Sequence, residues 1–320
     1  FFILNVIIKI GDRMKKLITT ITLLLTIGFL TIYYREIVQF LMIHVIYQDE
    51  ILVKEANQYE KNNQWEFVKE TDNFKPESKQ DILNIFYTAL NRGWDELTFY
   101  CPDSYKDCLD DVNEITSNQN TLSYVNNFVS TYNSYNKIRV NMNNFGRVNI
   151  EIQHIYQSSD IAELQAKVDE IYNEIMQDDM TDSDKVKAAH DYIINRTVYD
   201  EERSNEIKSG VGSDSIHTSN TAYGPLFIGK AICGGYTDAM ALFLDKIGLP
   251  NFKIASENHI WNVVYIDGQW KHLDLTWDDP VVDTGENILT HNYFLISTDD
   301  LKKKNEAQHQ FDKSIFQEAK

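Results

Sequence analysis

The chain has 320 residues, of which 43% are hydrophobic and 24% charged, and these values exclude collagen-like, mucin-like and wholly disordered proteins. A formal net charge of -18 also argues against non-specific nucleic-acid binding, which depends on clustered lysine and arginine. The charge is uneven, because five of the 30 basic residues but only two of the 48 acidic residues lie in residues 1–48. A basic, apolar start joined to an acidic body is typical of a membrane anchor that holds a soluble domain.

The uncharged segment 17–34 is the predicted membrane-spanning part of an anchor region, residues 1–48. It is close to the shortest helix that crosses a hydrocarbon core roughly 30 Å thick. Lys15 and Lys16 precede it, which favours a single-pass protein of the cell membrane with its C-terminal body outside the cytoplasm. The segment ends in Tyr33 and Tyr34 and lacks the small residues of a cleavage site. An uncleaved signal anchor is therefore favoured over a cleaved signal peptide or a buried core helix.

The residues on either side of this segment bear on where the anchor begins and ends. Met14-Lys15-Lys16 is typical of a natural start, which leaves open whether residues 1–13 belong to the natural protein. The apolar stretch 37–47 is expected to continue the helix or to lie along the membrane surface.

Residues 49–145 are predicted to form a mostly helical stalk or accessory region. Apolar residues at helical spacing, such as Ile82 and Ile85, indicate helices between residues 78 and 129. The stretch 133–144 is rich in Asn and Tyr and is expected to be a loop. Cys101 and Cys108 could form a disulfide if they lie in a loop, but a helix starting at Pro102 would hold their Cα atoms roughly 10 Å apart, too far to bridge. The sequence leaves the disulfide open.

Residues 146–300 are predicted to form the catalytic domain, and residues 301–320 a polar tail that caps it. Alternation over 148–152 indicates a strand, whereas 161–176 and 182–195 show helical spacing. A Gly/Ser-rich stretch, 204–219, is expected to be a mobile loop. The remainder alternates helix and strand, so the fold class is α+β.

Cys233 is the candidate nucleophile, because it lies between small residues just before an apolar helical stretch, 239–247, that Gly248 and Pro250 end. A sulfur at a helix N-terminus meets peptide dipoles and free N–H groups that favour a thiolate and can stabilise an oxyanion. Gly234 is expected to let a substrate backbone approach closely. A lone cysteine is more often inert packing, so Cys233 needs support from elsewhere in the chain.

That support comes from a predicted hairpin, formed by residues 259–266 and 269–276 around the turn Asp267-Gly268. If the turn has two residues, Ile266 pairs with Gln269, and His259 and Asp274 become diagonal neighbours on one face. A carboxylate there can hold one imidazole nitrogen and leave the other pointing toward a thiolate. This is the arrangement of nucleophile, base and orienting group used in covalent acyl transfer.

His272 lies on the same face and is the rival base, although it is expected to be farther from the sulfur than His259. Metal binding is the other use of Cys and His side chains. The sequence contains no CxxC, HxxxH or HExxH spacing, so neither a metal site nor a cofactor is predicted.

The sequence resembles the transglutaminase-like superfamily over about residues 180–297. The resemblance is carried by three passages in order, C-G-G-Y at 233–236, H-I-W-N at 259–262 and W-K-H-L-D-L-T-W-D-D-P at 270–280. It implies a papain-like α+β core in which the helix that starts at the cysteine packs on an antiparallel sheet. It also implies a triad carried over as Cys233, His259 and Asp274. No acidic loop marks a calcium site.

Two aromatic residues complete the predicted site. Trp261 is expected to form a wall of the substrate site, and Tyr223, about ten residues before the cysteine, to lie where a second oxyanion donor would act. The sequence thus predicts a thiol-dependent acyltransferase, protease or amidase acting on a protein or cell-wall peptide. The alternative is an inactive domain that binds such a peptide or a partner protein. Oligomeric state is not predicted.

Overall fold

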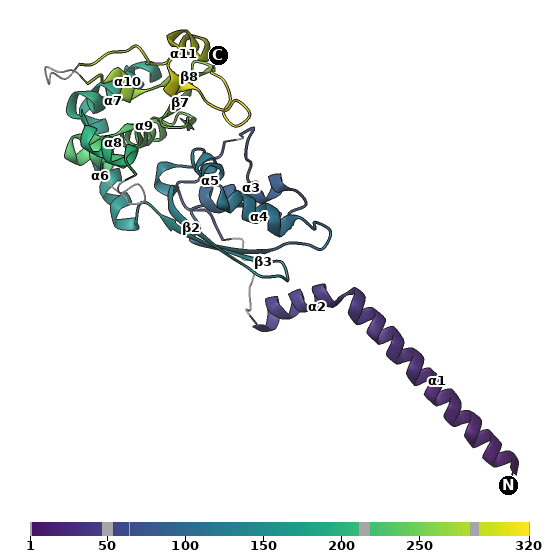
Figure 1. Cartoon of the computed structure of the whole chain (residues 1–320). Helices are drawn as coiled ribbons and strands as arrows, with labels where there is room; N and C mark the ends of the chain where they lie inside the picture. Colours follow the sequence, from purple (N-terminus) through teal and green to yellow (C-terminus); the bar gives the residue numbers. More distant parts are fainter. Residues whose placement is uncertain (1, 47–53, 64, 211–217, 282–287, 320) are drawn as a thin grey trace.

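The computed structural model describes residues 2–46, 54–63, 65–210, 218–281 and 288–319. Along the chain, a helical arm is followed by one body built around the strands β1–β3 and a second built around β6–β8 (Figure 1). The structure is mixed helix and sheet, as the sequence predicted.

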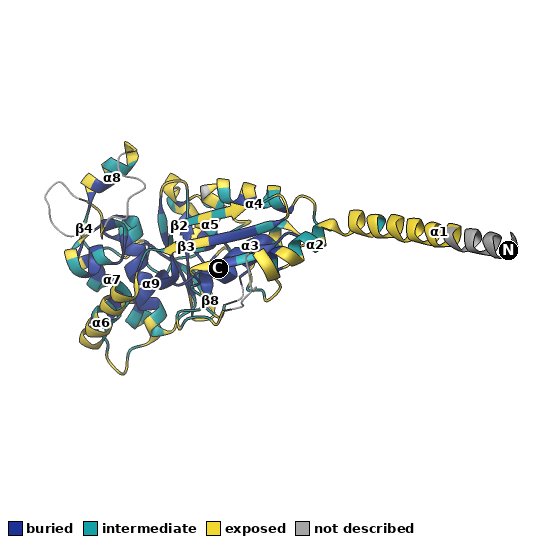
Figure 2. Ribbon diagram, turned by 90° about the horizontal axis from the view of Figure 1, so that it is seen from below, coloured by how far each residue is buried: buried dark blue, intermediate teal, exposed yellow. Residues whose placement is uncertain are grey.

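The N-terminal arm is a single long helix, α1 (Phe2–Ile32), that projects away from the rest of the molecule (Figure 1). Its part Arg13–Ile32 has 20 residues and a mean hydropathy of 1.6, and none of it is buried in the molecule. Figure 2 shows this helix exposed along its described length. It is therefore long and apolar enough to cross a membrane or to serve as a signal sequence.

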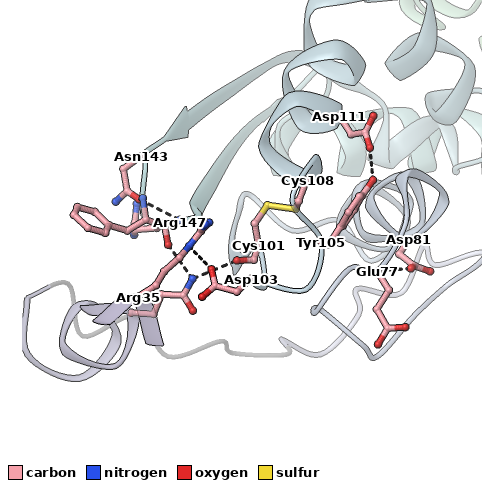
Figure 3. Close-up of a disulfide and its surroundings, with 12 residues drawn as sticks. Arg35, Glu77, Asp81, Cys101, Asp103, Tyr105, Cys108, Asp111, Asn143 and Arg147 are labelled. Carbon is pink, nitrogen blue, oxygen red and sulfur yellow. Dashed lines mark hydrogen bonds and ion pairs between the residues drawn. A yellow bond between two sulfur atoms is a disulfide. The ribbon is translucent and has the colours of Figure 1, made fainter. Parts of the chain in front are cut away.

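After α1 the chain forms α2 (Tyr34–Leu41) and a π-helical turn, η1 (Met42–Ile46), which pack on the first body. Arg35 Nε lies 2.6 Å from Asp103 Oδ1, and Gln39 Nε2 donates to the carbonyl oxygens of Cys101 and Phe145 (Figure 3). The stretch expected to continue the helix or lie on the membrane surface thus contacts the first body, through Gln39 and Met42.

The first body consists of helices packed on an antiparallel sheet with strand order β1-β3-β2. Its elements are α3 (Lys79–Asn91), β1 (Glu96–Tyr100), α4 (Cys108–Ser117), α5 (Gln119–Asn126), η2 (Thr131–Asn133), β2 (Tyr135–Met142) and β3 (Arg147–His154). The expectation of a loop over 133–144 was wrong, because most of it is β2. Its residues Ile138, Val140 and Met142 alternate with polar ones, and pairing with β3 outweighs the loop-like composition. The expected domain boundary at 145/146 falls in the β2–β3 turn, so β3 belongs to the first body.

The second body contains the sheet β6-β7-β8 and the helix that begins at the cysteine. Its first elements are α6 (Ser158–Ile175), α7 (Asp182–Arg196), β4 (Val198–Tyr199), α8 (Glu201–Lys208), η3 (Thr218–Asn220), η4 (Gly224–Ile228), β5 (Lys230–Ala231) and α9 (Cys233–Ile247). They are followed by β6 (Asn251–Ala255), β7 (Ile260–Ile266), β8 (Gln269–Leu273), α10 (Leu275–Asp278), α11 (Thr298–Lys304) and η5 (Ala307–His309). Helix α9 packs against β6 and β7 on one side and α7 on another. Of the expected mobile loop, 204–208 is helical and 211–217 lies outside the described residues.

The two bodies share one aromatic core. Phe128, which follows α5, stacks on Phe252 of β6 at 5.4 Å and on Phe316 of the tail at 5.7 Å between ring centroids. Trp65, from the irregular segment before α3, packs against both Phe128 and Phe252. The tail therefore completes the core, and the expected capping role understates its contribution.

Cys101 and Cys108 form a disulfide, with their Cα atoms 5.7 Å apart (Figure 3). The bridge fits because α4 begins at Cys108 and not at Pro102, which leaves the intervening residues free to turn. The question that the sequence left open is thus decided in favour of the disulfide, and Cys233 is the free cysteine.

Candidate active site

Cys233 is the first residue of α9, as predicted, and it is half-buried. Within the described residues, the backbone N–H groups of Cys233 and Gly234 have no hydrogen-bond acceptor. The next two N–H groups, of Gly235 and Tyr236, donate to the Ile232 carbonyl. The helix ends at Gly248, whose φ of 89° suits the left-handed C-cap. The sulfur therefore lies at the positive end of a buried helix, beside two free donors.

The β7–β8 hairpin has the predicted register, from Ile266 opposite Gln269 to Asn262 opposite Leu273. Asp267 and Gly268 both have positive φ, 52° and 77°, as a two-residue type I′ turn requires. The predicted strand over 269–276 is too long, however, since α10 begins at Leu275. The β7–β8 pairing ends at Asn262 and Leu273, because Asp274 leaves the sheet to cap this short helix.

Asp274 holds His259 through one carboxylate oxygen and the start of α10 through the other. His259 Nε2 donates to Asp274 Oδ2 at 2.6 Å. Asp274 Oδ1 accepts from the backbone N–H groups of Thr276 and Trp277 at 3.0 and 3.2 Å. The carboxylate is buried with its position fixed from both sides. Sequence reasoning predicted the partner of His259 but not the cap that positions it.

The remaining nitrogen of His259 is available to the cysteine. The Cys233 side chain lies close enough to interact with the His259 ring. Since Asp274 occupies Nε2, the nitrogen left for the sulfur is Nδ1. Burial opposes a charge on the ring, but the charge and hydrogen bond of Asp274 together with Cys233 raise the pKa of His259 to about 10. The imidazolium is thus the stable form at neutral pH, as a thiolate–imidazolium pair requires.

His309, from the C-terminal segment, is a further member of the site that sequence reasoning missed. Its Nε2 donates to the same oxygen, Asp274 Oδ2, at 2.8 Å, and its Nδ1 is buried with no partner among the described residues. Its ring packs at right angles to Trp261 and lies 5.0 Å from Trp277. Burial opposes the ionised form of Asp274, but His259 and His309 hold the pKa of that carboxyl well below its usual range. No spacing signal links residues 35 positions apart in the sequence.

We expect His309→Phe to lower kcat by roughly 10- to 100-fold, because Asp274 loses one hydrogen bond to a charged group, worth about 1.5–3 kcal/mol. Phenylalanine keeps the packing against Trp261 and Trp277, which separates the hydrogen bond from the shape. Steady-state rates over a range of pH should show the alkaline fall in rate displaced in this variant, with the melting temperature little changed. An unchanged kcat and pH profile would assign His309 to packing alone. His44→Phe, at an exposed position, is the control.

His272, the rival base, is a core residue. Its Nδ1 accepts from the indole N–H of Trp261 at 3.1 Å, and its Nε2 bonds with Thr298 Oγ1 at 2.8 Å. Burial, reinforced by nearby His309, lowers the pKa of His272 to about 3. A neutral ring with both nitrogens occupied has no proton to exchange with a substrate, so His272 is not the base.

The three residues expected to bind substrate lie in different surroundings. A Cβ on Gly234 would stand 3.0 Å from the Asn220 carbonyl oxygen. The absence of a side chain at Gly234 therefore makes room for the backbone of η3 and not for a substrate. Trp261 is 1% exposed and stacks on His259 at 5.5 Å, which makes it the wall behind the imidazole and not a surface for substrate. Tyr223 donates its hydroxyl to Glu163 of α6 at 2.8 Å, and no described contact joins it to the triad.

Asp278 and Asp279, which lie near the end of the third sequence passage, are both buried. Asp279 accepts from the Tyr236 hydroxyl at 2.5 Å, and burial raises its pKa to about 6. Asp278 accepts from His190. The turn is therefore an internal anchor of α10.

No family model matches the chain, and no curated protein matches its sequence. Among solved structures it is similar to the crystal structure of a TGase, with 17% identity and a TM-score of 0.36 over 50% of this chain and 48% of that one. It is also similar to the crystal structure of a proposed cysteine protease from Cytophaga hutchinsonii, with 15% identity and a TM-score of 0.26 over 44% of this chain and 61% of that one. The chain thus spans about half of the first structure and less than two thirds of the second.

Proposed function

We propose that this chain is a transglutaminase-like cysteine enzyme, anchored in the membrane with its body outside the cytoplasm. It transfers or hydrolyses an acyl group from an amide of a protein or cell-wall peptide. The observation that carries the proposal is the position of His259, which donates to Asp274 through Nε2 and lies close enough to Cys233 to interact with it. Cysteine, imidazole and carboxylate in this order form the activated nucleophile of acyl transfer.

The reaction follows from these positions. The Cys233 thiolate attacks the amide carbon, and the oxyanion accepts from the free backbone N–H groups of Cys233 and Gly234. The His259 imidazolium then gives its Nδ1 proton to the leaving amine, which departs and leaves a thioester. Water or a second amine next gives a proton to His259 and attacks the thioester carbon. The thiolate is released, with a carboxylic acid or a new amide as product.

The three residues of the proposed triad differ in how deeply they are buried. His259 and Asp274 are buried, whereas Cys233 is half-buried at the end of its helix. The stacked Trp261 excludes water from the imidazole and so strengthens its interaction with the carboxylate. The substrate therefore meets the sulfur, the adjacent backbone N–H groups and the Nδ1 edge of the imidazole, while Asp274 stays out of its reach.

The choice between transfer and hydrolysis is tested by offering both acceptors. The protein is incubated with a glutamine-containing donor protein and a fluorescent primary amine, while ammonia release and amine incorporation are measured. We expect ammonia release from the intact chain and none from Cys233→Ala; amine incorporation would add crosslinking to hydrolysis. If neither changes with Cys233, and Cys233→Ala still binds cell-wall peptide, the chain is a binding module.

The proposed topology is supported by Lys15 and Lys16 before an apolar helix and by the Cys101–Cys108 disulfide, which persists in oxidising compartments. Protease added to intact protoplasts should remove the body, and a labelling reagent that does not cross membranes should modify its lysines. Complete protection in both assays would contradict this orientation.

A further inference from the structure

A second group of histidine and aspartate side chains shares no residue with the Cys233 site. It consists of His190 and Asp191 of α7 and His291 of the segment 288–293, here called the α7 cluster. His190 Nδ1 lies 2.9 Å and His291 Nε2 2.7 Å from the same atom, Asp191 Oδ1. The two nitrogens therefore meet at one carboxylate oxygen, and the three possible ligand atoms all lie within 4.8 Å of one another.

The His190 ring is held in one orientation. It is fully buried, and its Nε2 lies 3.2 Å from Asp278 Oδ2. The other oxygen of Asp278 accepts from Thr290 Oγ1 and from the Tyr293 backbone N–H, at 2.9 and 3.0 Å. A carboxylate on the far nitrogen of an imidazole is the support that metal-binding histidines commonly have, because it fixes the ring and makes the near nitrogen more basic.

The carboxylate and the surroundings are also arranged for a ligand. Lys187 Nζ holds Asp191 Oδ2 at 2.5 Å, which leaves Oδ1 directed to the two imidazoles. Phe294 packs edge-on against both imidazole rings, at 5.2 and 5.6 Å, and lines one side with apolar surface. The His291 side chain is 36% exposed and that of Asp191 22%, so the opposite side is open to water.

In the absence of an ion, the cluster is held together by hydrogen bonds to Asp191 and Asp278. A carboxylate oxygen only accepts, so each nitrogen that faces Asp191 carries a proton when no ion is present. His190 also faces Asp278, and its ring is then a buried cation between two carboxylates. A metal ion would replace the protons between the three ligand atoms and keep the Asp278 contact.

We propose that the α7 cluster binds a divalent transition-metal ion of the zinc type through His190 Nδ1, Asp191 Oδ1 and His291 Nε2, with water as the fourth ligand. Two imidazoles and a carboxylate suit zinc and disfavour Mg²⁺ and Ca²⁺, which prefer oxygen ligands. Bonds of 2.0–2.1 Å place tetrahedral ligand atoms roughly 3.4 Å apart, so the present contacts open by roughly 0.6 Å on binding. The exposed His291 and the partly exposed Asp191 carboxylate can move by that amount while the buried His190 stays in place.

The ion would connect three parts of the second body. It joins α7 to segment 288–293 directly, and Asp278 extends the connection to α10. Because Asp274 caps α10, zinc would stabilise the element that carries the orienting carboxylate of the proposed triad. The spacing of residues in the sequence could not predict this site, since two of its ligands are 100 residues apart.

The test is zinc binding by the whole chain in detergent, stripped beforehand with a chelator. Zn²⁺ is titrated in competition with a chromogenic chelator, and bound zinc is counted by mass spectrometry. We expect one tightly bound zinc per chain, at least ten-fold weaker binding in His291→Ala and Asp191→Asn, and no change in the exposed control His44→Ala. Zinc should raise the melting temperature of the wild type and not that of His291→Ala.

The Cys233 site contains other zinc ligands, so the assignment needs a second variant. Cys233→Ala should retain the zinc, and the Co²⁺-substituted wild type should lack the near-ultraviolet charge-transfer band of a thiolate ligand. The proposal is overturned if the wild type binds no zinc, if His291→Ala and Asp191→Asn bind it as tightly as the wild type, or if only Cys233→Ala loses it. None of these readouts depends on enzymatic activity.

Discussion

Asp274→Asn should lower kcat by on the order of 10⁴-fold while the chain stays folded. The asparagine carbonyl can still accept from the N–H groups that begin α10, so its amide nitrogen must replace Oδ2. That nitrogen donates, and His259 can meet it only with an unprotonated Nε2. The ring proton then moves to Nδ1 and points at Cys233, where the ring can no longer take up a proton. Single-turnover rates and a melting curve on the same sample measure both effects.

The pH profile separates this explanation from a general loss of order. In the wild type the charged form of His259 is favoured, so the rate of leaving-group protonation holds below pH about 10 and falls as pH rises through that value. Without the carboxylate charge the fall should move to lower pH, toward the ordinary pKa of about 6.5 for histidine. A variant with full activity, or with an unmoved profile, would remove Asp274 from the mechanism.

Phe128→Ala should lower the free energy of unfolding by about 3–5 kcal/mol, the usual cost of removing a buried aromatic side chain. Phe128 is 2% exposed and packs on Trp65, Phe252 and Phe316, which come from three separate parts of the chain. Because these rings join the two bodies, we expect one cooperative transition that shifts as a whole. Denaturant unfolding of the chain, followed by tryptophan fluorescence, measures the change.

Phe145→Ala is the matched control, since this side chain lies in the exposed β2–β3 turn and should change stability by less than about 0.5 kcal/mol. Two separate transitions, of which only one responds to Phe128→Ala, would show that the bodies unfold independently. A small effect of Phe128→Ala would contradict the shared core.

The predictions that succeeded rest on local signals. Asp267-Gly268 specifies a tight turn, and the turn alone fixes the β7–β8 register as far as Leu273. Gly248 and Pro250 mark the end of the helix that Cys233 begins. Each signal acts within a few residues, so tertiary structure has little opportunity to override it.

The features that escaped prediction depend on distant parts of the chain. His309 reaches Asp274 only because the tail folds back over the second sheet. Asp278 is buried because His190, 88 residues earlier, faces it. Trp261 was expected at a substrate surface, but its indole N–H bonds to His272 within the core. The spacing of residues in the sequence does not predict such long-range contacts. The β2 strand, in contrast, could have been predicted from its two-residue alternation of apolar and polar residues, but its Asn- and Tyr-rich composition favoured a loop.

The central claim, that His259 and Asp274 activate Cys233, is tested most directly by the rate at which iodoacetamide alkylates Cys233. Cys101 and Cys108 are bonded to each other, so the native chain offers the reagent a single thiol. Peptide mass spectrometry at neutral pH should give a rate constant well above that of a free cysteine peptide. His259→Ala should lower it to the peptide value or below. A wild-type rate equal to that of the free peptide, or one unchanged in His259→Ala, would contradict the activated cysteine.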